Sequence, residues 1–229
     1  MNQEFDHLAP KYKELLNDPV REYFAPGSKF FLTRKIEMML EFADRQPLDT
    51  RQATWLDVGC GKGEMLRAAQ PHFGKALGCD VSLGMISECR ELEVVHQVDP
   101  LRLPFQNGSI DWVTAICILH HIRPHEQALL LRDIYRVLRP GGIFAIIEHN
   151  PFNPAVQLIT RRTPVDENAK LLTARSARRL VRAASMRLLE TRYFLYVPER
   201  IYRWAAPVER ALGRVPFGGQ YVVFGRKPA

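Results

Sequence analysis

The chain has 229 residues, of which 46% are hydrophobic and 25% charged, the composition of one soluble globular domain with a sizeable core. Collagen, intrinsic disorder and a small disulfide-stabilised scaffold are excluded. The formal net charge is +7, and residues 161–214 hold 13 of the 32 lysines and arginines but only 5 of the 25 aspartates and glutamates. The basic character therefore belongs to one segment.

Neither a membrane-spanning helix nor a signal peptide is predicted, because no apolar run approaches about 18 residues and the N-terminus is charged. The expected location is cytoplasmic. The cysteines form no CxxC pair and have no histidine at zinc-finger spacing. We therefore expect them to be reduced and buried, and we expect no metal site.

Residues 1–48 are predicted to form a helical cover, with helical stretches at Glu14–Leu16 and Phe30–Phe42. Apolar residues at helical spacing usually pack in a core. The alternative is that the aromatic residues of this segment lie over a ligand, which makes Tyr12 a candidate substrate contact. The aromatic residues concerned are Tyr12, Tyr23, Phe24, Phe30 and Phe31.

Residues 50–150 alternate short β-rich apolar runs with helical stretches, which is typical of a parallel sheet covered on both faces. A one-sided helix over Leu130–Leu138 is expected to stop at Arg139–Gly142, before the fifth strand. The predicted strands are Thr54–Val58, Lys75–Asp80, Val94–Asp99, Ile110–Ile118 and Ile143–Glu148.

Residues 151–229 have a looser pattern. About twenty residues broken by three prolines are longer than a usual crossover loop, which indicates a functional insertion facing the substrate. Thr173 is expected to cap a helix that extends to Ser185, with its arginines opposite its apolar stripe. The last two predicted strands, Leu188–Val197 and Gln220–Gly225, are separated by an amphipathic aromatic stretch at Arg200–Leu212.

The strongest motif lies at residues 55–64, where a strand leads into a loop with three alternate glycines and then into a helix at Glu64–Ala69. Glycines let a ligand approach the backbone, and a helix start offers unpaired N–H groups. A dinucleotide fingerprint would place a small residue where this chain has Glu64, and a carboxylate there argues against a pyrophosphate.

Two acidic residues complete the nucleotide prediction. Asp80 closes the second strand, where a carboxylate can accept hydrogen bonds from both hydroxyls of a ribose. Asp99 closes the third predicted strand and precedes an apolar wall that includes Leu101, Leu103 and Phe105, which suits an adenine. The expected ligand is an adenosine derivative without a pyrophosphate.

Four motifs in this order resemble the class I S-adenosylmethionine-dependent methyltransferases of the type 11 group over about residues 50–155. They are LDVGCGKGEML, GCDVS, the stretch from Asp99 through LPFQNGSIDWVTAICILHHI, and LLRDIYRVLRPGGIFAIIEHNPFNP. The resemblance implies an α/β fold: a Rossmann-like, doubly wound, seven-stranded, mostly parallel sheet whose last strand is antiparallel, with helices on both faces. It implies one domain over residues 1–229 and S-adenosyl-L-methionine as the cofactor.

The resemblance also implies roles for individual residues. The glycine loop would pack against the methionine part of the cofactor, Asp57 would lie near its amino group, Asp80 would bind the ribose and Asp99 the adenine amine. Pro100 lacks an N–H, so the adenine contact would depend more on Asp99 and Leu101. The predicted cofactor-binding residues are Asp57, Gly59, Gly61, Gly63, Asp80, Val81, Met85, Asp99, Pro100, Leu101, Ala115 and Ile116.

Methyl transfer from a sulfonium requires mainly orientation, which can supply ~7–11 kcal/mol. A base is needed only for an acceptor that must lose a proton. The ends of the fourth and fifth strands offer His120, Glu148 and His149 as candidates, of which His149 is preferred, and purely structural roles are the alternative. His121 and Asn150 join Tyr12 as predicted substrate contacts.

The expected acceptor is a small molecule with an O, N or C nucleophile, such as a glycan, lipid-linked or natural-product intermediate. The segment after Pro151 resembles a bacterial subset of the family through EHNPFNP, TPVDENAKLL and PFGGQYVVFGRKP. Its basic residues have three explanations: solvated helix faces, an anionic membrane surface or acceptor, or RNA. Without a recognisable RNA-binding appendage, nucleic acid is the less favoured partner, and an RNA methyltransferase or a non-catalytic cofactor-binding subunit are the alternatives.

Overall fold

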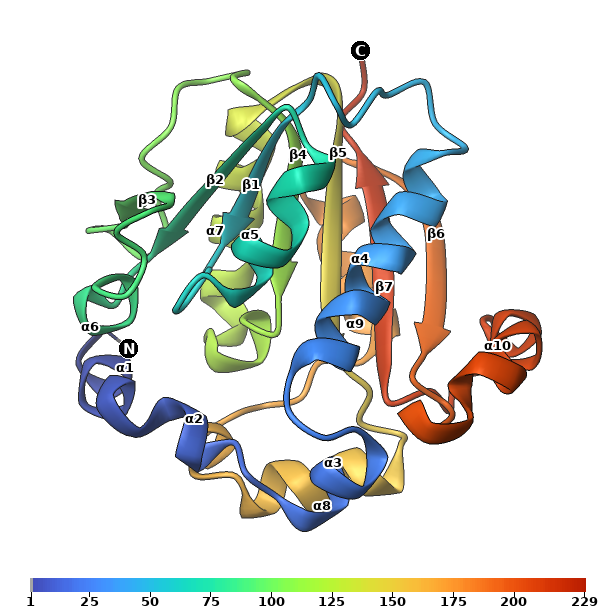
Figure 1. Ribbon diagram of the computed structural model, residues 1–229. Coiled ribbons are helices and arrows are strands. Elements are labelled where there is room, and N and C mark those ends of the chain that lie inside the picture. The colour runs from blue at the N-terminus through green and yellow to red at the C-terminus, as the bar shows by residue number, and fades with distance from the viewer. Residues whose placement is uncertain (1) are drawn as a thin grey trace.

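Seven strands form one sheet in the computed structural model, which describes residues 2–229; their order is β3-β2-β1-β4-β5-β7-β6 (Figure 1). Strands β1 to β5 pair in parallel, whereas β7 is antiparallel to both β5 and β6. The predicted Rossmann-like sheet with an antiparallel last strand is therefore confirmed. The strands are β1 (Thr54–Val58), β2 (Lys75–Asp80), β3 (Glu93–His96), β4 (Ile110–Ile116), β5 (Leu138–His149), β6 (Arg187–Phe194) and β7 (Gln220–Arg226).

Helices cover both faces of the sheet, because successive side chains of a strand point to opposite faces. Trp55 and Trp112 pack on the face covered by α4 and α5, whereas their neighbours Leu56 and Val113 pack on the face covered by α7 and α9. Figure 1 shows the first pair of helices in front of the sheet and the second behind it. These helices are α4 (Lys29–Ala43), α5 (Glu64–Ala69), α7 (Pro124–Val137) and α9 (Ala174–Ala183).

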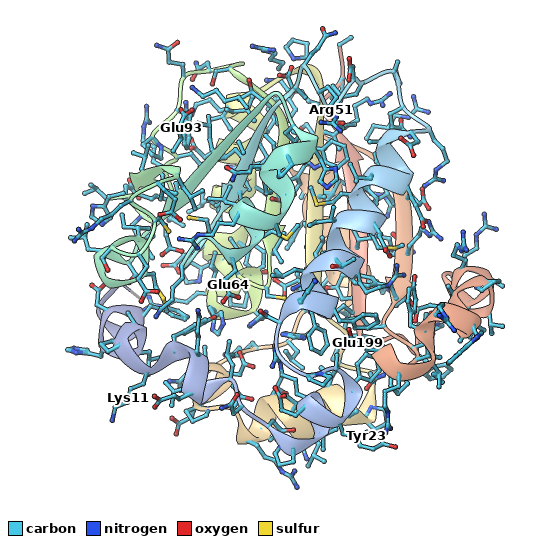
Figure 2. All side chains as sticks on the ribbon, in the orientation of Figure 1. Lys11, Tyr23, Arg51, Glu64, Glu93 and Glu199 are labelled. Atoms are coloured by element: carbon cyan, nitrogen blue, oxygen red, sulfur yellow. The ribbon has the colours of Figure 1, made fainter. Side chains whose placement is uncertain are left out.

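The other helices gather around the lower end of the molecule in Figure 1, where the parallel strands end. They are α1 (Asn2–Leu8), α2 (Tyr12–Leu15), α3 (Pro19–Phe24), α6 (Leu83–Ile86), α8 (Pro154–Arg162) and α10 (Glu199–Leu212), with short 3-10 turns η1 (Ala9–Lys11), η3 (Leu119–His121) and η4 (Pro164–Asp166) nearby. Figure 2 marks this end by Lys11 and Tyr23 and the opposite end by Arg51. Because ligands of parallel α/β sheets bind beyond the carboxyl ends of the strands, this is the end where a site is expected.

Four predicted boundaries differ from the structure for backbone reasons. Strand β3 ends at His96 because the chain turns at Asp99, whose carboxylate accepts a hydrogen bond from the Leu101 N–H, so Asp99 does not close the strand. Strands β4 and β6 end early because Cys117 and Leu195 have positive φ angles of 54° and 63°. Residues Arg139–Gly142, predicted to separate the helix from the fifth strand, instead form the first part of β5, where the pairing of β5 with β4 has a register shift.

The largest aromatic cluster of the front face should dominate the stability of the fold. Phe42 of α4 stacks on Phe224 of β7 with ring centroids 3.8 Å apart and meets Trp112 edge to face. We expect Phe42→Ala to lower the free energy of unfolding by about 3–5 kcal/mol, because it leaves a cavity in a rigid core. Urea unfolding measures this change, and Val98→Ala, at a side chain 75% exposed, is the control expected within about 0.5 kcal/mol of wild type. A small loss for Phe42→Ala would contradict the assignment.

Candidate functional site

A cavity of about 280 Å³ lies beyond the carboxyl ends of β1, β2 and β4. The strands supply its floor, with Asp57 and Asp80 among the lining residues, and the N-terminal helices supply a wall that includes Tyr12 and Phe31. Helix α1 is tied over this end of the sheet because Asp6 accepts hydrogen bonds from the Ser82 hydroxyl at 2.5 Å and the Gly84 N–H at 2.9 Å. The predicted helical cover therefore includes residues that enclose a ligand site.

The glycine loop runs along the cavity between β1 and α5. At Gly61 the backbone has a φ angle of +53°, which other residues rarely adopt, and its N–H donates to Asp80 Oδ2 at 2.8 Å. A Cβ at Gly61 would meet nothing within 4 Å, whereas one at Gly59 would approach Ile118 to 2.5 Å. Gly61 therefore leaves an open, concave stretch of backbone that a ligand can approach.

Asp80 sits at the end of β2 and organises this corner. Its two carboxylate oxygens accept from the Gly61 and Ser82 N–H groups at 2.8 and 2.9 Å, and its side chain is buried. Burial raises the pKa of Asp80 above its ordinary value, although the backbone N–H groups oppose this shift. Each oxygen keeps a lone pair, so Asp80 can still accept hydrogen bonds from a pair of hydroxyls.

Asp57 is the charged group that the fold buries most deeply next to the cavity. Its Oδ1 accepts from the Thr114 hydroxyl at 2.7 Å, and that hydroxyl oxygen in turn accepts from the Trp55 indole N–H at 3.0 Å. Burial raises the pKa of Asp57 to about 7, against the lowering effects of the Thr114 hydrogen bond and of the Lys35 charge. The charged form of a carboxylate in this environment is strongly stabilised by a bound cation.

Several polar residues of the cavity were not predicted from the sequence. Lys35, Lys62 and Gln97 all line it, and Lys62 is held by Glu88 at 2.6 Å. Lys35 lies on α4, and Gln97 follows β3, where its amide donates to the Pro100 carbonyl at 2.9 Å. Lys62 lies within the glycine-loop motif, whereas no motif marks Lys35 and Gln97, because these two reach the cavity only through the packing of α4 and the turn after β3.

The structure brings ten of the predicted cofactor and substrate residues together and leaves others outside the cavity. Asp99 is exposed, Leu101 lies beside it in the chain, Gly63 faces Leu92 and Ala115 is buried within β4; none of these four lines the cavity. The predicted residues that do line it are Tyr12, Asp57, Gly59, Gly61, Asp80, Val81, Met85, Pro100, Ile116 and His121.

The predicted catalytic residues form a buried cluster behind the cavity wall. Glu148 accepts from the Leu119 N–H at 2.8 Å and contacts His120 Nδ1 at 2.5 Å, and neither Glu148, His120 nor His149 lines the cavity. Despite burial, Glu148 and Asp166 hold the pKa of His120 well above its ordinary value. Burial and the His120 charge lower the pKa of His149 to about 4. Catalytic roles for these residues stay a prediction.

Asn150, a predicted substrate contact, has a clear structural environment. It is buried, and its amide donates to the carbonyls of Pro216 and Gly218 at 3.0 and 2.8 Å. These bonds join the end of β5 to the loop before β7, and Asn150 does not line the cavity. Its position supports the loop rather than offering a free polar group to a ligand.

The residues present fit an adenosine-type ligand that carries positive charge. A buried carboxylate at Asp57, a hydrogen-bonding carboxylate at Asp80 and an open glycine backbone share one cavity with apolar walls. This combination suits an amino acid linked through a cationic sulfur to adenosine. Glu64 also lines the cavity, and its carboxylate at the start of α5 disfavours a pyrophosphate there.

Residues 56–146 match the family described as a methyltransferase domain. A tRNA (carboxymethyluridine(34)-5-O)-methyltransferase from Macaca fascicularis is 36% identical over 88 residues, which cover 38% of this chain and 13% of that protein. A demethylmenaquinone methyltransferase from Thermus thermophilus is 30% identical over 154 residues, which cover 64% of each chain. This chain thus spans less than two thirds of either relative.

Among solved structures, an S-adenosylmethionine-dependent methyltransferase from Archaeoglobus fulgidus shares the fold with a TM-score of 0.66 at 19% identity, over 90% of this chain and 97% of that one. Among residues 2–229, no helix is both long and apolar enough to cross a membrane.

The raised pKa of Asp57 predicts a pH dependence of stability. The folded state holds the proton up to about pH 7, whereas the unfolded carboxyl releases it near its ordinary value of 3.8, so stability falls as pH rises through this window. Asp57→Asn mimics the protonated form. We expect the variant to be more stable than wild type by an amount that grows to at most about 4 kcal/mol between pH 4 and pH 7 and is constant above. Urea unfolding at several pH values measures it, and a pH-independent difference would contradict it.

Proposed function

We propose that the protein transfers a methyl group from S-adenosyl-L-methionine to a small apolar acceptor that it meets at an anionic membrane surface. The observation that carries the acceptor class is an exposed apolar stripe on α10, flanked by arginines, at the same end of the molecule as the cavity. The match of residues 56–146 to the methyltransferase domain family supports the reaction, and relatives of this chain include methyltransferases named for demethylmenaquinone and for tRNA.

In the proposed complex the chain's own groups divide the work of binding the cofactor. Asp57 pairs with the amino group of its methionine part, Asp80 holds the ribose hydroxyls, and Lys35 attracts its carboxylate. The adenine lies near Gln97 and Pro100, which line the cavity, in place of the sequence-based assignment to Asp99. When bound, the cofactor supplies an electrophilic methyl group on a positively charged sulfur.

The chain contributes orientation and exclusion of water. Tyr12, Phe31 and His121 form walls of the cavity, so an acceptor is held between the N-terminal helices and the ends of the strands. Burial raises the pKa of Tyr12, which keeps its hydroxyl neutral and able to donate a hydrogen bond. Restricting two reactants in this way can supply ~7–11 kcal/mol of the barrier without a dedicated base.

Helix α10 buries one charged residue, Glu209, and leaves three large apolar side chains exposed. Glu209 is buried, pairs with Arg34 of α4 at 2.9 Å and accepts from the Tyr196 N–H at 2.9 Å. On the outer face Ile201, Trp204 and Val208 are 48, 68 and 58% exposed. Because a surface helix normally buries its apolar side, this orientation indicates a partner that takes apolar groups.

The apolar surface continues beyond α10 across the same end of the molecule. Arg200 lies over the exposed ring of Tyr23 of α3, and α3 contacts α8. Asn153 donates to the Phe217 carbonyl at 2.8 Å, which joins α8 to the exposed loop after α10. Helices α8 and α10 and the loop after α10 also carry exposed arginines: Arg161, Arg162, Arg200, Arg203, Arg210 and Arg214. Aromatic and aliphatic groups rimmed by arginines match an anionic lipid surface.

The cofactor assignment predicts a loss of affinity without loss of fold. Asp57→Asn removes the negative charge facing the cationic cofactor, and we expect its dissociation constant to rise about 10- to 100-fold because a charged hydrogen-bonding pair is lost. Isothermal titration of the cofactor measures this. The exposed Asp49, at the opposite end of the molecule beside Arg51, provides the control Asp49→Asn, which should bind as wild type does. Equal affinities for both variants would refute the role of Asp57.

The membrane assignment predicts binding to anionic vesicles through α10. We expect cosedimentation with phosphatidylglycerol vesicles, weaker binding to phosphatidylcholine alone, and at least a tenfold loss in the variant Ile201→Ser/Trp204→Ser/Val208→Ser, because about three buried side chains are removed from the lipid. The matched control Val98→Ser changes an exposed apolar residue away from α10.

The acceptor class is tested with labelled cofactor and separated lipid, small polar and RNA fractions of a cell extract. Label in the lipid fraction is expected. Label in RNA alone, or no vesicle binding by the wild-type protein, would overturn the membrane-associated acceptor while leaving the cofactor assignment intact.

A further inference from the structure

Three ligand-type atoms converge beside the cavity from two segments that lie 45 residues apart. His120 and His121 belong to η3 at the end of β4, and Asp166 belongs to η4 in the segment after β5. Asp166 Oδ1 lies 3.5 Å from His120 Nε2 and 3.6 Å from His121 Nε2. The ligand atoms of all three residues lie within 4.8 Å of one another.

These distances suit a bound transition-metal ion. Ligands at about 2.0–2.1 Å from a tetrahedral Zn²⁺ are roughly 3.3–3.5 Å apart, so the Asp166 oxygen already lies at a suitable separation from both imidazole nitrogens. Two imidazoles and one carboxylate are also a donor set that Zn²⁺ and related ions accept, with one position left open.

A second carboxylate, that of Glu148, contacts the ring nitrogen of His120 that would not bind the metal, as is usual for metal-bound histidines. Glu148 contacts His120 Nδ1 at 2.5 Å and is itself fixed by the Leu119 N–H at 2.8 Å. A hydrogen bond to Nδ1 orients the ring and leaves Nε2 to face a metal. The ring of His121 is held edge to face by Phe5 at 5.1 Å.

The charges of the cluster also favour a cation. Glu148 is fully buried, and the Asp166 side chain is only 11% exposed. A divalent ion bound by neutral imidazoles would balance these two carboxylates, which would otherwise depend on protonated histidines. Of the three ligand residues, His121 also lines the cavity, which places the cluster beside the ligand space.

We propose that His120, His121 and Asp166 bind a divalent transition-metal ion of the Zn²⁺ class, whose open coordination position takes an oxygen of the acceptor. Metal binding stands independently of the proposed methyl transfer, whereas the use of the open position rests on it. The ion would hold the acceptor oxygen against the wall formed by Tyr12 and His121.

The test is a titration of Co²⁺ into the full chain after treatment with a chelator, without cofactor or acceptor. We expect one equivalent to bind with the visible absorption of a four- or five-coordinate site, and Zn²⁺ to displace it. Asp166→Asn and His121→Ala should each lower the Co²⁺ affinity at least tenfold, and Glu148→Gln should lower it about 10- to 100-fold through the orientation of His120.

The matched control is His125→Ala, because His125 is an exposed histidine on α7 that does not belong to the cluster. Circular dichroism verifies that each variant folds. Absence of stoichiometric Co²⁺ binding, or equal binding by wild type and Asp166→Asn, would overturn the metal site while cofactor titration still reports on the proposed function. Metal binding with methyl transfer that is unaffected by removal of the ion would overturn the role of the open position.

Discussion

Buried carboxylates at the carboxyl ends of the parallel strands are the constraint on which the rest of this structure depends. Asp57 ends in the floor of the cavity, Asp80 closes β2, and Glu148 lies near the end of β5 with no exposed surface. A buried charge is costly unless it is hydrogen-bonded or paired. Two of these carboxylates therefore hold nearby backbone in place. Asp80 accepts a hydrogen bond from the glycine loop, and Glu148 accepts one from the turn after β4.

The basic residues of the segment 161–214 have two kinds of environment: some form ion pairs or cover helices, and others are exposed. Arg192 pairs with Glu41 at 2.9 Å, which ties β6 to α4, and the outer arginines of α9 oppose its buried Ala177 and Val181. These arginines have the structural role that the sequence also allowed. The exposed arginines of α10 are different, because they accompany apolar side chains that no element of the described chain covers. The arginines of this segment therefore belong to two groups, one packed against the sheet and its helices and one exposed beside uncovered apolar side chains.

The part of the site that a sequence can reveal is the part that is contiguous along the chain. The strand, glycine loop and helix of residues 54–69 are specified locally, and Thr173 caps α9 as predicted, with its hydroxyl accepting from the Ser176 N–H. Lys35 and Gln97 reach the cavity only through tertiary packing, so their spacing carries no signal. The metal site that we propose could not be predicted from the sequence for the same reason, because cysteine and histidine spacing cannot relate His121 to an aspartate 45 residues away.

The aromatic residues near the C-terminus show why residue type alone does not define a contact surface. Phe194 is buried, the Tyr196 hydroxyl donates to the Leu212 carbonyl, and Tyr202 lies under Arg34, so these rings hold α10 in place. Trp204 and Phe217 are largely exposed instead, and the exposed aliphatic side chains of Ile201 and Val208 lie on the same helix as Trp204. The buried Arg34–Glu209 pair fixes this orientation, because turning the apolar stripe of α10 inward would move Glu209 to the surface and break the pair. The exposed surface of α10 is therefore set by an ion pair inside the protein.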